Sequence, residues 1–378
     1  MIRGLFALGA ALALAGCGVS SAPEATVSPS ASASSPAACQ PEQAVQALPL
    51  ETRIRQLLFA GVYTGAADPM ADAQSAARAG VGGINFLGND PQPYANGELA
   101  AVTAAVGDIP PFLAVDQEGG RVQRLSPLIG SQPSARQMGA TMSPAEVQAL
   151  AATTGEAMAG LGLTMDLAPV ADVSDQPADA VIGDRAFSGD PAKVTVYSGA
   201  YAQGLRSAGI IPVLKHFPGI GSASGNTDFE PATSPPLAQL QAVDLVPYRQ
   251  LLAADPVAVM MGTAVVPDLT AGAPAALSPA AVDLLRKDLG FDGVVMTDSL
   301  SGAAVESLHP LPEAAELALI AGVDMVLWGS TAEIDAVVSR LTDAVSAGRL
   351  PQARVDEAVA RVLALKDIDA CGLAATVE

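Results

Sequence analysis

The sequence is poor in cysteine, histidine, aromatic residues and positive charge. Its 378 residues include 3 cysteines, 2 histidines and 1 tryptophan, and aromatic residues make up only 4%. The two histidines are far apart and no Cys and His residues cluster with the spacing of metal ligands, so we expect no metal site and no cofactor. No glycine-rich loop opens a helix in the way that a phosphate-binding loop does.

Basic residues are half as frequent as acidic ones, and this imbalance restricts the possible partners. The chain has 19 Lys and Arg against 39 Asp and Glu, a net charge of −20. This charge argues against nucleic acid as a partner and against docking on anionic lipid through basic patches. It suits an uncharged or cationic partner, although acidity that only confers solubility explains it as well. Hydrophobic residues make up 50%, enough for one large core or two small ones.

The N-terminal stretch predicts an export signal and a tether. Arg3 precedes the apolar run Leu5–Ala15, which is too short to span a bilayer and is typical of a signal peptide. The run leads into Leu-Ala-Gly-Cys, which resembles a lipoprotein processing box. We therefore expect a signal peptide of residues 1–17 and a lipidated Cys17 on the outer face of the cytoplasmic membrane, with ordinary secretion as the alternative. Residues 18–46, rich in Ser, Ala and Pro, are predicted to be a flexible tether.

The two remaining cysteines, Cys39 and Cys371, lie at opposite ends of the predicted folded part. An even number of thiols outside the cytoplasm favours a disulfide, which here would close nearly the whole chain into a loop. Two unpaired surface thiols are the alternative. Barrel-like folds often bring their termini together, and this favours the bond.

From about Leu50 onward, short apolar runs alternate with amphipathic, alanine-rich stretches, which is the pattern of a βα repeat with a parallel sheet. Eight runs suit a TIM-type (β/α)8 barrel, and we predict one α/β domain over residues 47–378. A doubly wound open sheet would show the same alternation, but polar motifs fall where the predicted strands end, which favours the barrel. The predicted strands are Leu57–Val62, Val81–Phe86, Phe112–Val115, Thr164–Ala168, Ile210–Leu214, Ala258–Met261, Gly293–Thr297 and Asp324–Leu327; helices with clear signals are Ser143–Leu161, Ser278–Asp288 and Ala353–Lys366.

The most distinctive motif follows the fifth predicted strand. After the apolar run, Lys215 and His216 enter Phe-Pro-Gly-Ile-Gly, a segment that cannot continue as strand or helix. Asp228 and Glu230 come a few residues later. A solvated turn with incidental charges is the alternative for a loop of this composition.

Other predicted strands also end in charged motifs. The third runs into Asp116-Gln-Glu-Gly-Gly-Arg-Val-Gln-Arg124, the fourth is followed by Ile-Gly-Asp-Arg185-Ala-Phe, and the seventh ends in Met-Thr-Asp298-Ser-Leu. Crowded or buried charges cost free energy unless they are paired or used in function. A salt-bridge network at the barrel rim is the alternative for the Asp116 motif, and a helix N-cap is the alternative for Asp298.

Taken together, these motifs resemble glycoside hydrolase family 3, and particularly its bacterial β-N-acetylhexosaminidases of the single-domain type that trim cell-wall fragments. The resemblance covers roughly Leu57 to Lys366, and several separate motifs occur in the same order. It implies a carbohydrate substrate containing N-acetylglucosamine, and no second domain. We expect a monomer that meets the membrane only through its lipid anchor.

The resemblance also assigns roles by position. Asp298 matches the nucleophile of a retaining hydrolase. We expect Glu118 and Arg121 to form a structural ion pair, and Asp172 and Asp184 to cap loops. The residues that the resemblance places around the sugar of the innermost subsite are Asp116, Arg124, Arg185, Lys215 and His216.

At the acid/base, however, the sequence departs from the family pattern. The family's Asp-Ser-His falls on Asn226, Thr227 and Asp228, and Ile220 replaces a further histidine of the motif. A histidine with an ordinary pKa near 6.5 is partly protonated at neutral pH, whereas an aspartate near 3.9 is protonated only about one part in a thousand.

Three hypotheses follow from this change. Asp228 or Glu230 serves as a desolvated acid/base, as carboxylic acids do in most glycosidases. Alternatively, the loop has lost acid catalysis, which leaves a carbohydrate-binding lipoprotein that retains the sugar subsite. In the third hypothesis, His309 reaches the site from the loop after the seventh strand.

Overall fold

The computed structural model describes residues 39–377 apart from 105, 107–108 and 254–256. The predicted signal peptide, Cys17 and most of the tether lie outside this part. The tether prediction is wrong at its C-terminal end, because α1 (Pro41–Ala44) and the 3-10 helix η1 (Val45–Ala47) lie within or directly after it. Val45 is buried, so this segment packs as part of the folded domain.

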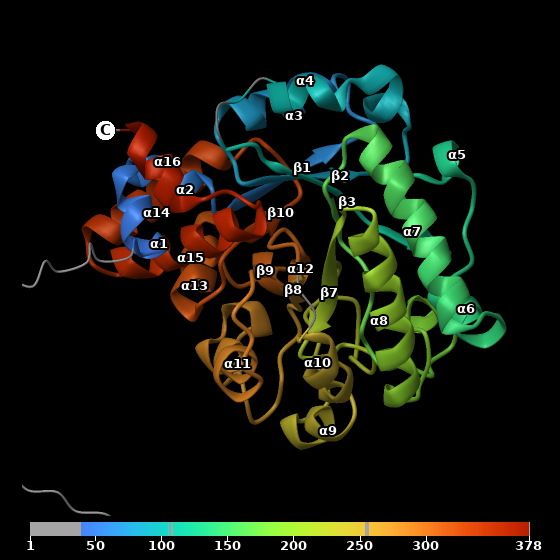
Figure 1. Cartoon of the computed structure of the whole chain (residues 1–378). Helices are drawn as coiled ribbons and strands as arrows, with labels where there is room; N and C mark the ends of the chain where they lie inside the picture. The colour runs from blue at the N-terminus through green and yellow to red at the C-terminus, as the bar shows by residue number, and fades with distance from the viewer. Residues whose placement is uncertain (1–38, 105, 107–108, 254–256, 378) are drawn as a thin grey trace, which may run out of the picture. The chain divides into compact units, whose positions relative to one another are not determined.

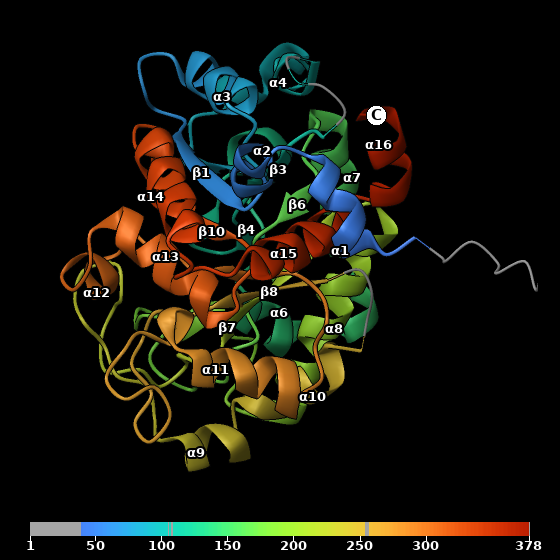
Figure 2. The same cartoon turned by 90° about the vertical axis from the view of Figure 1, so that its left-hand side faces the viewer.

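Eight parallel strands form the barrel of Figures 1 and 2: β1 (Leu58–Tyr63), β2 (Gly83–Leu87), β3 (Phe112–Val115), β6 (Met165–Asp166), β7 (Ile211–Phe217), β8 (Ala258–Met261), β9 (Val295–Thr297) and β10 (Val326–Trp328). Their order is β10-β1-β2-β3-β6-β7-β8-β9. The bridge Met296–Met325 joins the two ends of this order. The predicted TIM-type barrel is therefore confirmed, and the open sheet is excluded. A short antiparallel pair, β4 (Gln117–Gly119) and β5 (Val122–Gln123), follows β3.

The strands read as continuous apolar runs because both faces of the sheet are covered. All residues of β3 and β8 are buried, which leaves no alternation of apolar and polar positions. Both strands have the bounds predicted from the sequence. The fifth predicted strand ends too early, however, since β7 continues pairing with β8 through a register shift as far as Phe217. Lys215 and His216 are thus strand residues, held at the end of the barrel.

Helices surround the strands in both views (Figures 1 and 2). Ser143 caps α7 in a capping box with Glu146, as predicted, and Gly162 ends it in the left-handed conformation. The predicted helix after Ser278 divides into α11 and the π-helix η5 (Leu284–Asp288). The helices are α2 (Leu50–Arg55), α3 (Pro69–Arg78), α4 (Leu99–Ala104), α5 (Ser126–Ile129), α6 (Ala135–Thr141), α7 (Pro144–Leu161), α8 (Pro191–Ser207), α9 (Leu237–Ala242), α10 (Leu245–Leu251), α11 (Pro279–Asp283), α12 (Ala303–Glu306), α13 (Leu311–Ala321), α14 (Ile334–Ser346), α15 (Gln352–Leu365) and α16 (Ala370–Val377).

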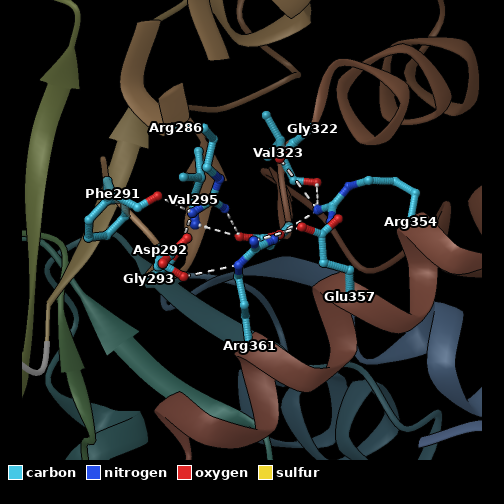
Figure 3. Close-up of polar contacts among 11 residues, drawn as sticks. Arg286, Phe291, Asp292, Gly293, Val295, Gly322, Val323, Arg354, Glu357 and Arg361 are labelled. Carbon is cyan, nitrogen blue, oxygen red and sulfur yellow. Dashed lines mark hydrogen bonds and ion pairs between the residues drawn. The ribbon is translucent and has the colours of Figure 1, made fainter. Parts of the chain in front are cut away.

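A cluster of charged residues, here named the seam clamp, joins β9 to β10 at the amino-terminal ends of these strands. Figure 3 shows its arginine and glutamate side chains around Val295. It consists of Asp324, which is fully buried, with Arg286, Arg354, Arg361 and Glu357. Three guanidinium groups contact the Asp324 carboxylate, with Arg361 at 3.3 Å. The same carboxylate accepts a hydrogen bond from the backbone of β9, at Val295, over 2.9 Å. Asp324 therefore links the two strands where backbone pairing is sparse.

The two ends of the described domain are joined covalently. Cys39 and Cys371 form a disulfide with a Cα–Cα distance of 6.2 Å. Helix α1 packs against α15 and α16 (Figure 2). This packing places Cys39, just before α1, beside Cys371 in α16. None of the described helices is long and apolar enough to cross a membrane.

Candidate active site

A cavity of about 230 Å³ opens at the carboxyl ends of the barrel strands. Parallel strands of a barrel direct the side chains that follow them toward a common mouth, so residues distant in the sequence meet there. The cavity is lined by the nucleophile candidate, the acid/base candidate and every predicted sugar-binding residue: Asp298, Asp228, Asp116, Arg124, Arg185, Lys215 and His216.

The two remaining acid/base candidates lie elsewhere. Glu230 is exposed and does not line the cavity. His309 lies beyond α12 and its Nδ1 is 2.9 Å from Glu313 Oε1, one helical turn further on. Of the three candidates, Asp228 is the one that lines the cavity.

A buried charge network forms the floor of the cavity. Lys215 is only 2% exposed, and its Nζ lies 2.7 Å from both Asp116 Oδ1 and Glu118 Oε1. Glu118 also accepts two hydrogen bonds of 2.8 Å from the guanidinium of Arg185. The predicted pair of Glu118 with Arg121 is therefore wrong, because the β4–β5 hairpin directs Glu118 inward and Arg121 outward. Two carboxylates, Asp116 and Glu118, and two cations, Lys215 and Arg185, therefore form one network in which each charge is compensated.

Arg121 instead supports the loop that carries Arg185. Its guanidinium donates to the carbonyl groups of Ala178 and Ala180 over 2.6 Å, and it lies 3.4 Å from Asp184. Asp184 thus pairs with an arginine, and the loop-capping role predicted for it is not what the structure shows. These contacts hold the 3-10 helix η3 (Gly183–Arg185) against the cavity wall.

The charges of this network keep its carboxylates ionised. Burial acts to raise the pKa of Asp116, but the positive charges of Lys215 and Arg124 outweigh burial and lower it. Burial likewise opposes ionisation of Glu118, and Arg185 and Lys215 lower its pKa strongly. Asp116, which is half-buried and lines the cavity, is therefore a permanent acceptor for hydroxyl groups of a ligand.

Asp172 is a buried partner of His216. Its Oδ2 lies 2.7 Å from His216 Nδ1, and its Oδ1 accepts a hydrogen bond of 2.8 Å from the backbone N–H of Ile220. Only the second contact is a loop cap, so the prediction for Asp172 was incomplete. A carboxylate on Nδ1 fixes the orientation and tautomer of the imidazole. The signal in the sequence was an aspartate in an apolar Pro-Val-Ala-Asp-Val segment directly after a strand.

The loop that bears Asp228 is fastened to the loop that follows β9. The backbone N–H groups of Ala303 and Ala304, at the start of α12, donate to the carbonyl groups of Asp228 and Thr227 over 3.1 Å. Asn226 Oδ1 accepts the N–H of Asp228 over 3.0 Å, which is an Asx turn. Asp228 is an exposed residue, but its carboxyl is partly withdrawn from solvent at the cavity, and this partial burial raises its pKa; the nearby charge of Asp298 raises it further.

Asp298 sits at the end of β9 on backbone hydrogen bonds. Its N–H donates to Met261 O and its Oδ1 accepts the N–H of Ser299, both over 2.8 Å. The side chain is half-buried and faces the cavity. Two carboxyl groups from different strand ends, Asp228 and Asp298, therefore lie close enough to influence each other electrostatically in one sugar-sized cavity. Within the described ranges, no group of three or more His, Cys, Asp or Glu side chains could hold a metal ion.

Comparison with known proteins identifies the family. Residues 50–365 match the family described as glycosyl hydrolase family 3 N terminal domain. The chain belongs to glycosyl hydrolase family 3. It is 48% identical over 323 residues to Beta-hexosaminidase LpqI of Mycobacterium tuberculosis, covering 83% of this chain and 82% of that protein.

Solved structures of glycosyl hydrolase family 3 have the same fold. The structure of a family member from Mycobacterium smegmatis has a TM-score of 0.81 at 46% identity, covering 86% of this chain and 98% of that one. The β-N-acetylglucosaminidase from Paenibacillus has a TM-score of 0.79 at 31% identity, covering 85% of this chain and 62% of that one. The protein is therefore a glycosidase on the barrel scaffold of its family.

Asp244, just before α10, is a buried acid of this family 3 barrel that the sequence analysis missed. It is 3% exposed, and burial together with the charge of Asp172 raises its pKa to about 7. A carboxyl whose pKa is raised on folding binds its proton more tightly in the native state than in the unfolded chain. The free energy of unfolding therefore falls as the pH rises from about 4 to about 7, and levels off above that.

The substitution Asp244→Asn, which removes the titrating group, is expected to remove this pH dependence. Relative to the wild type, the variant should gain about 2–4 kcal/mol in the free energy of unfolding between pH 4 and pH 8. Urea unfolding at several pH values measures the difference. Parallel stability curves for the two proteins would show that Asp244 does not hold a proton in the folded state.

Proposed function

We propose that the protein is a retaining β-N-acetylhexosaminidase that acts on cell-wall-derived saccharides containing N-acetylglucosamine, with Asp298 as nucleophile and Asp228 as acid/base. The observation that carries the proposal is the pair of carboxyl groups facing one cavity, of which Asp228 has its pKa raised by burial and by Asp298. The substrate class rests on the similarity to a beta-hexosaminidase and a β-N-acetylglucosaminidase.

The chemistry needs both carboxyl groups in opposite protonation states. Ionised Asp298 attacks the anomeric carbon while protonated Asp228 gives its proton to the departing oxygen, so that the glycosidic bond breaks as the glycosyl-enzyme ester forms. Asp228, now a carboxylate, then takes a proton from water as that water attacks the ester, which restores Asp298. A raised pKa at Asp228 increases the fraction that starts in the acid form.

The cavity also has an apolar side. Ile220, which stands where the family motif has histidine, lines the cavity and packs in a small apolar cluster with Val170, Ile182 and Ala186. Position 220 therefore contributes no titratable group to the cavity, and the acid/base role is left to Asp228.

Comparing two leaving groups tests the acid/base role. In the wild type we expect turnover of both an activated aryl N-acetylglucosaminide and N,N′-diacetylchitobiose. Asp228→Asn should lower kcat/KM for the disaccharide by about 10²-fold and affect the activated compound much less, because only the disaccharide needs a proton on its leaving oxygen. Steady-state kinetics on both substrates give the ratio.

Glu230→Gln is the matched control, since this acid lies two residues from Asp228 on the same loop and is also exposed, but does not line the cavity. It should leave both rates within about twofold of the wild type. An equal loss on both substrates in Asp228→Asn, or a selective loss in Glu230→Gln, would contradict the assignment.

A carbohydrate-binding lipoprotein without hydrolytic activity is the second candidate function. It is favoured by the replacement of the family's loop triplet by Asn226, Thr227 and Asp228 while the sugar-binding positions are retained. If the wild type cleaves neither substrate but binds N-acetylglucosamine in calorimetry, this second function holds.

We also propose that the mature protein is anchored through lipid at Cys17. The support is the sequence alone: a short apolar run, a processing box and a Ser-, Ala- and Pro-rich stretch before the folded domain. Expressed in a bacterium that lipidates proteins, the full chain should fractionate with membranes, and Cys17→Ser should move it to the soluble fraction. Mass spectrometry should show acyl chains on the N-terminal peptide of the wild type; an unmodified Cys17 contradicts the anchor.

A further inference from the structure

Behind His216, on the side away from the cavity, the domain buries a group of titratable side chains that the proposed chemistry does not use. Asp172 is fully buried and Asp244 is 3% exposed. One oxygen of the Asp244 carboxyl, Oδ1, and the hydroxyl of Tyr248 are buried without a hydrogen-bond partner in the described part of the chain. Buried polar atoms without a partner are uncommon in folded proteins because they cost free energy of folding. Where they occur, a functional role or protonation of the group accounts for them.

The turn after β7 locks these groups together. The N–H of Ile220 donates to Asp172 over 2.8 Å, and the neighbouring Gly219 presses against the Asp244 side chain. A Cβ at position 219 would lie 2.5 Å from that of Asp244, and the φ of 132° also requires glycine. The same short turn therefore contacts both carboxyl groups, and His216 lies at its start.

The charges in this region do not balance if both acids are ionised. His216 is the only basic side chain bonded to the pair among the described residues, through Nδ1 to Asp172 at 2.7 Å. From the other elements, Arg185 of η3 acts electrostatically on Asp172, and Tyr248 of α10 lies near both acids. Two ionised carboxylates in a dry region are unfavourable, so one acid retains its proton.

We propose that Asp172 is a positioning residue that holds His216 with its Nδ1 proton directed toward the Asp172 carboxylate, and that Asp244 retains a proton. The two buried acids, Asp172 and Asp244, then carry a single negative charge between them. The inference rests on the proposed glycosidase function, because His216 lines the same cavity as the sugar-binding residues. With Nδ1 held by Asp172, Nε2 is the ring nitrogen left to accept a hydrogen bond from a sugar hydroxyl.

The proton on Asp244 matters for the position of His216. Burial and the charge of Asp172 raise the pKa of Asp244 to about 7, so this acid ionises near neutral pH. Its ionisation places a second carboxylate charge beside Asp172 in a region without solvent, where the two charges repel. This repulsion disturbs the hydrogen bond between Asp172 and His216 Nδ1 that orients the imidazole toward the cavity. Asp244 therefore sets how far toward alkaline pH the enzyme works.

Imidazole NMR tests the positioning role without any turnover, and the chain suits it because it has only two histidines. With His309→Gln to assign the signals, ¹⁵N-labelled protein is expected to show neutral His216 as a single tautomer protonated at Nδ1. Asp172→Asn should abolish this single tautomer, and Asp244→Asn should preserve it. The same Nδ1–H tautomer in Asp172→Asn would overturn the positioning role of Asp172.

The pH profile tests the role of Asp244. The value of kcat/KM is expected to fall between pH 6 and pH 8 in both proteins, and the fall should be at least about threefold smaller in Asp244→Asn than in the wild type. The reason is that the neutral amide of the variant cannot add the second charge. Asp283→Asn is the matched control and should keep the wild-type profile, because this acid on α11 pairs with Lys287 and its side chain is 51% exposed. An unchanged profile in Asp244→Asn would overturn this role.

Calorimetry separates this inference from the proposed function. If the protein binds N-acetylglucosamine but cleaves no glycoside, the same pH comparison is made on its affinity for the sugar. A pH-dependent affinity in the wild type that flattens in Asp244→Asn supports the buried pair even though hydrolysis is absent. An affinity with the same pH dependence in both proteins contradicts it.

Discussion

Replacing Asp298 by asparagine is expected to lower kcat/KM by about 10³-fold or more for both the aryl glycoside and the disaccharide, because no group remains to form the glycosyl-enzyme bond. The fold should survive, since an asparagine Oδ1 still accepts the N–H of Ser299, which now lies 2.8 Å from the Asp298 carboxylate. Both rates are measured beside a thermal unfolding curve of the variant.

Nucleophile rescue distinguishes lost chemistry from a damaged site. In Asp298→Ala, azide should restore turnover of the activated aryl glycoside and yield a glycosyl azide with inverted anomeric configuration, because azide enters through the space left by the side chain. Wild-type activity in either Asp298 variant would mean that another group forms the bond. Failure of both to bind N-acetylglucosamine would mean that Asp298 mainly holds the sugar.

The seam clamp should dominate the stability of the barrel closure. Asp324→Asn removes the charge that compensates Arg286, Arg354 and Arg361, and is expected to lower the free energy of unfolding by about 3–5 kcal/mol. Guanidinium cations confined near one another without their carboxylate repel, whereas the amide still offers an acceptor for Val295. Chemical unfolding of purified protein measures the loss.

Asp335→Asn is the control for this experiment, because Asp335 also pairs with an arginine, Arg55, at 3.2 Å but its side chain is 91% exposed. Exposed ion pairs contribute little, so this variant should lie within about 1 kcal/mol of the wild type. Equal stability losses in the two variants would contradict a special role of the buried cluster.

The barrel was predictable because its strands are buried on both faces. Continuous apolar runs such as those of β3 and β8 stand out against alanine-rich helices, and both were located to the residue. Strand ends near the site were harder to place, since β7 continues through Lys215 and His216. The side chains of both residues are buried against carboxylates that only the folded barrel brings to them. The helical segment 41–47 was missed because a single buried valine in a polar stretch carries little pattern.

The candidate site, like the fold, was predictable only in part. Resemblance to the family predicted which residues would meet in the cavity, and they do line it. It did not predict their pairing: Glu118 bonds Arg185 and Lys215 rather than Arg121, because partners separated by many tens of residues are set by the loop geometry. Asp244 was missed altogether, since an aspartate near a helix start reads as an ordinary surface residue.

The backbone hydrogen bonds between the Asp228 loop and α12 bear on how such a site changes over time. The carbonyl groups of Thr227 and Asp228 hold the loop to Ala303 and Ala304, and main-chain atoms are common to every amino acid. Substitutions of the three side chains at 226–228 therefore leave these backbone hydrogen bonds, and with them the position of the loop, unchanged. A lineage could thus trade one proton donor for another by point substitution, and a designer could trade it back.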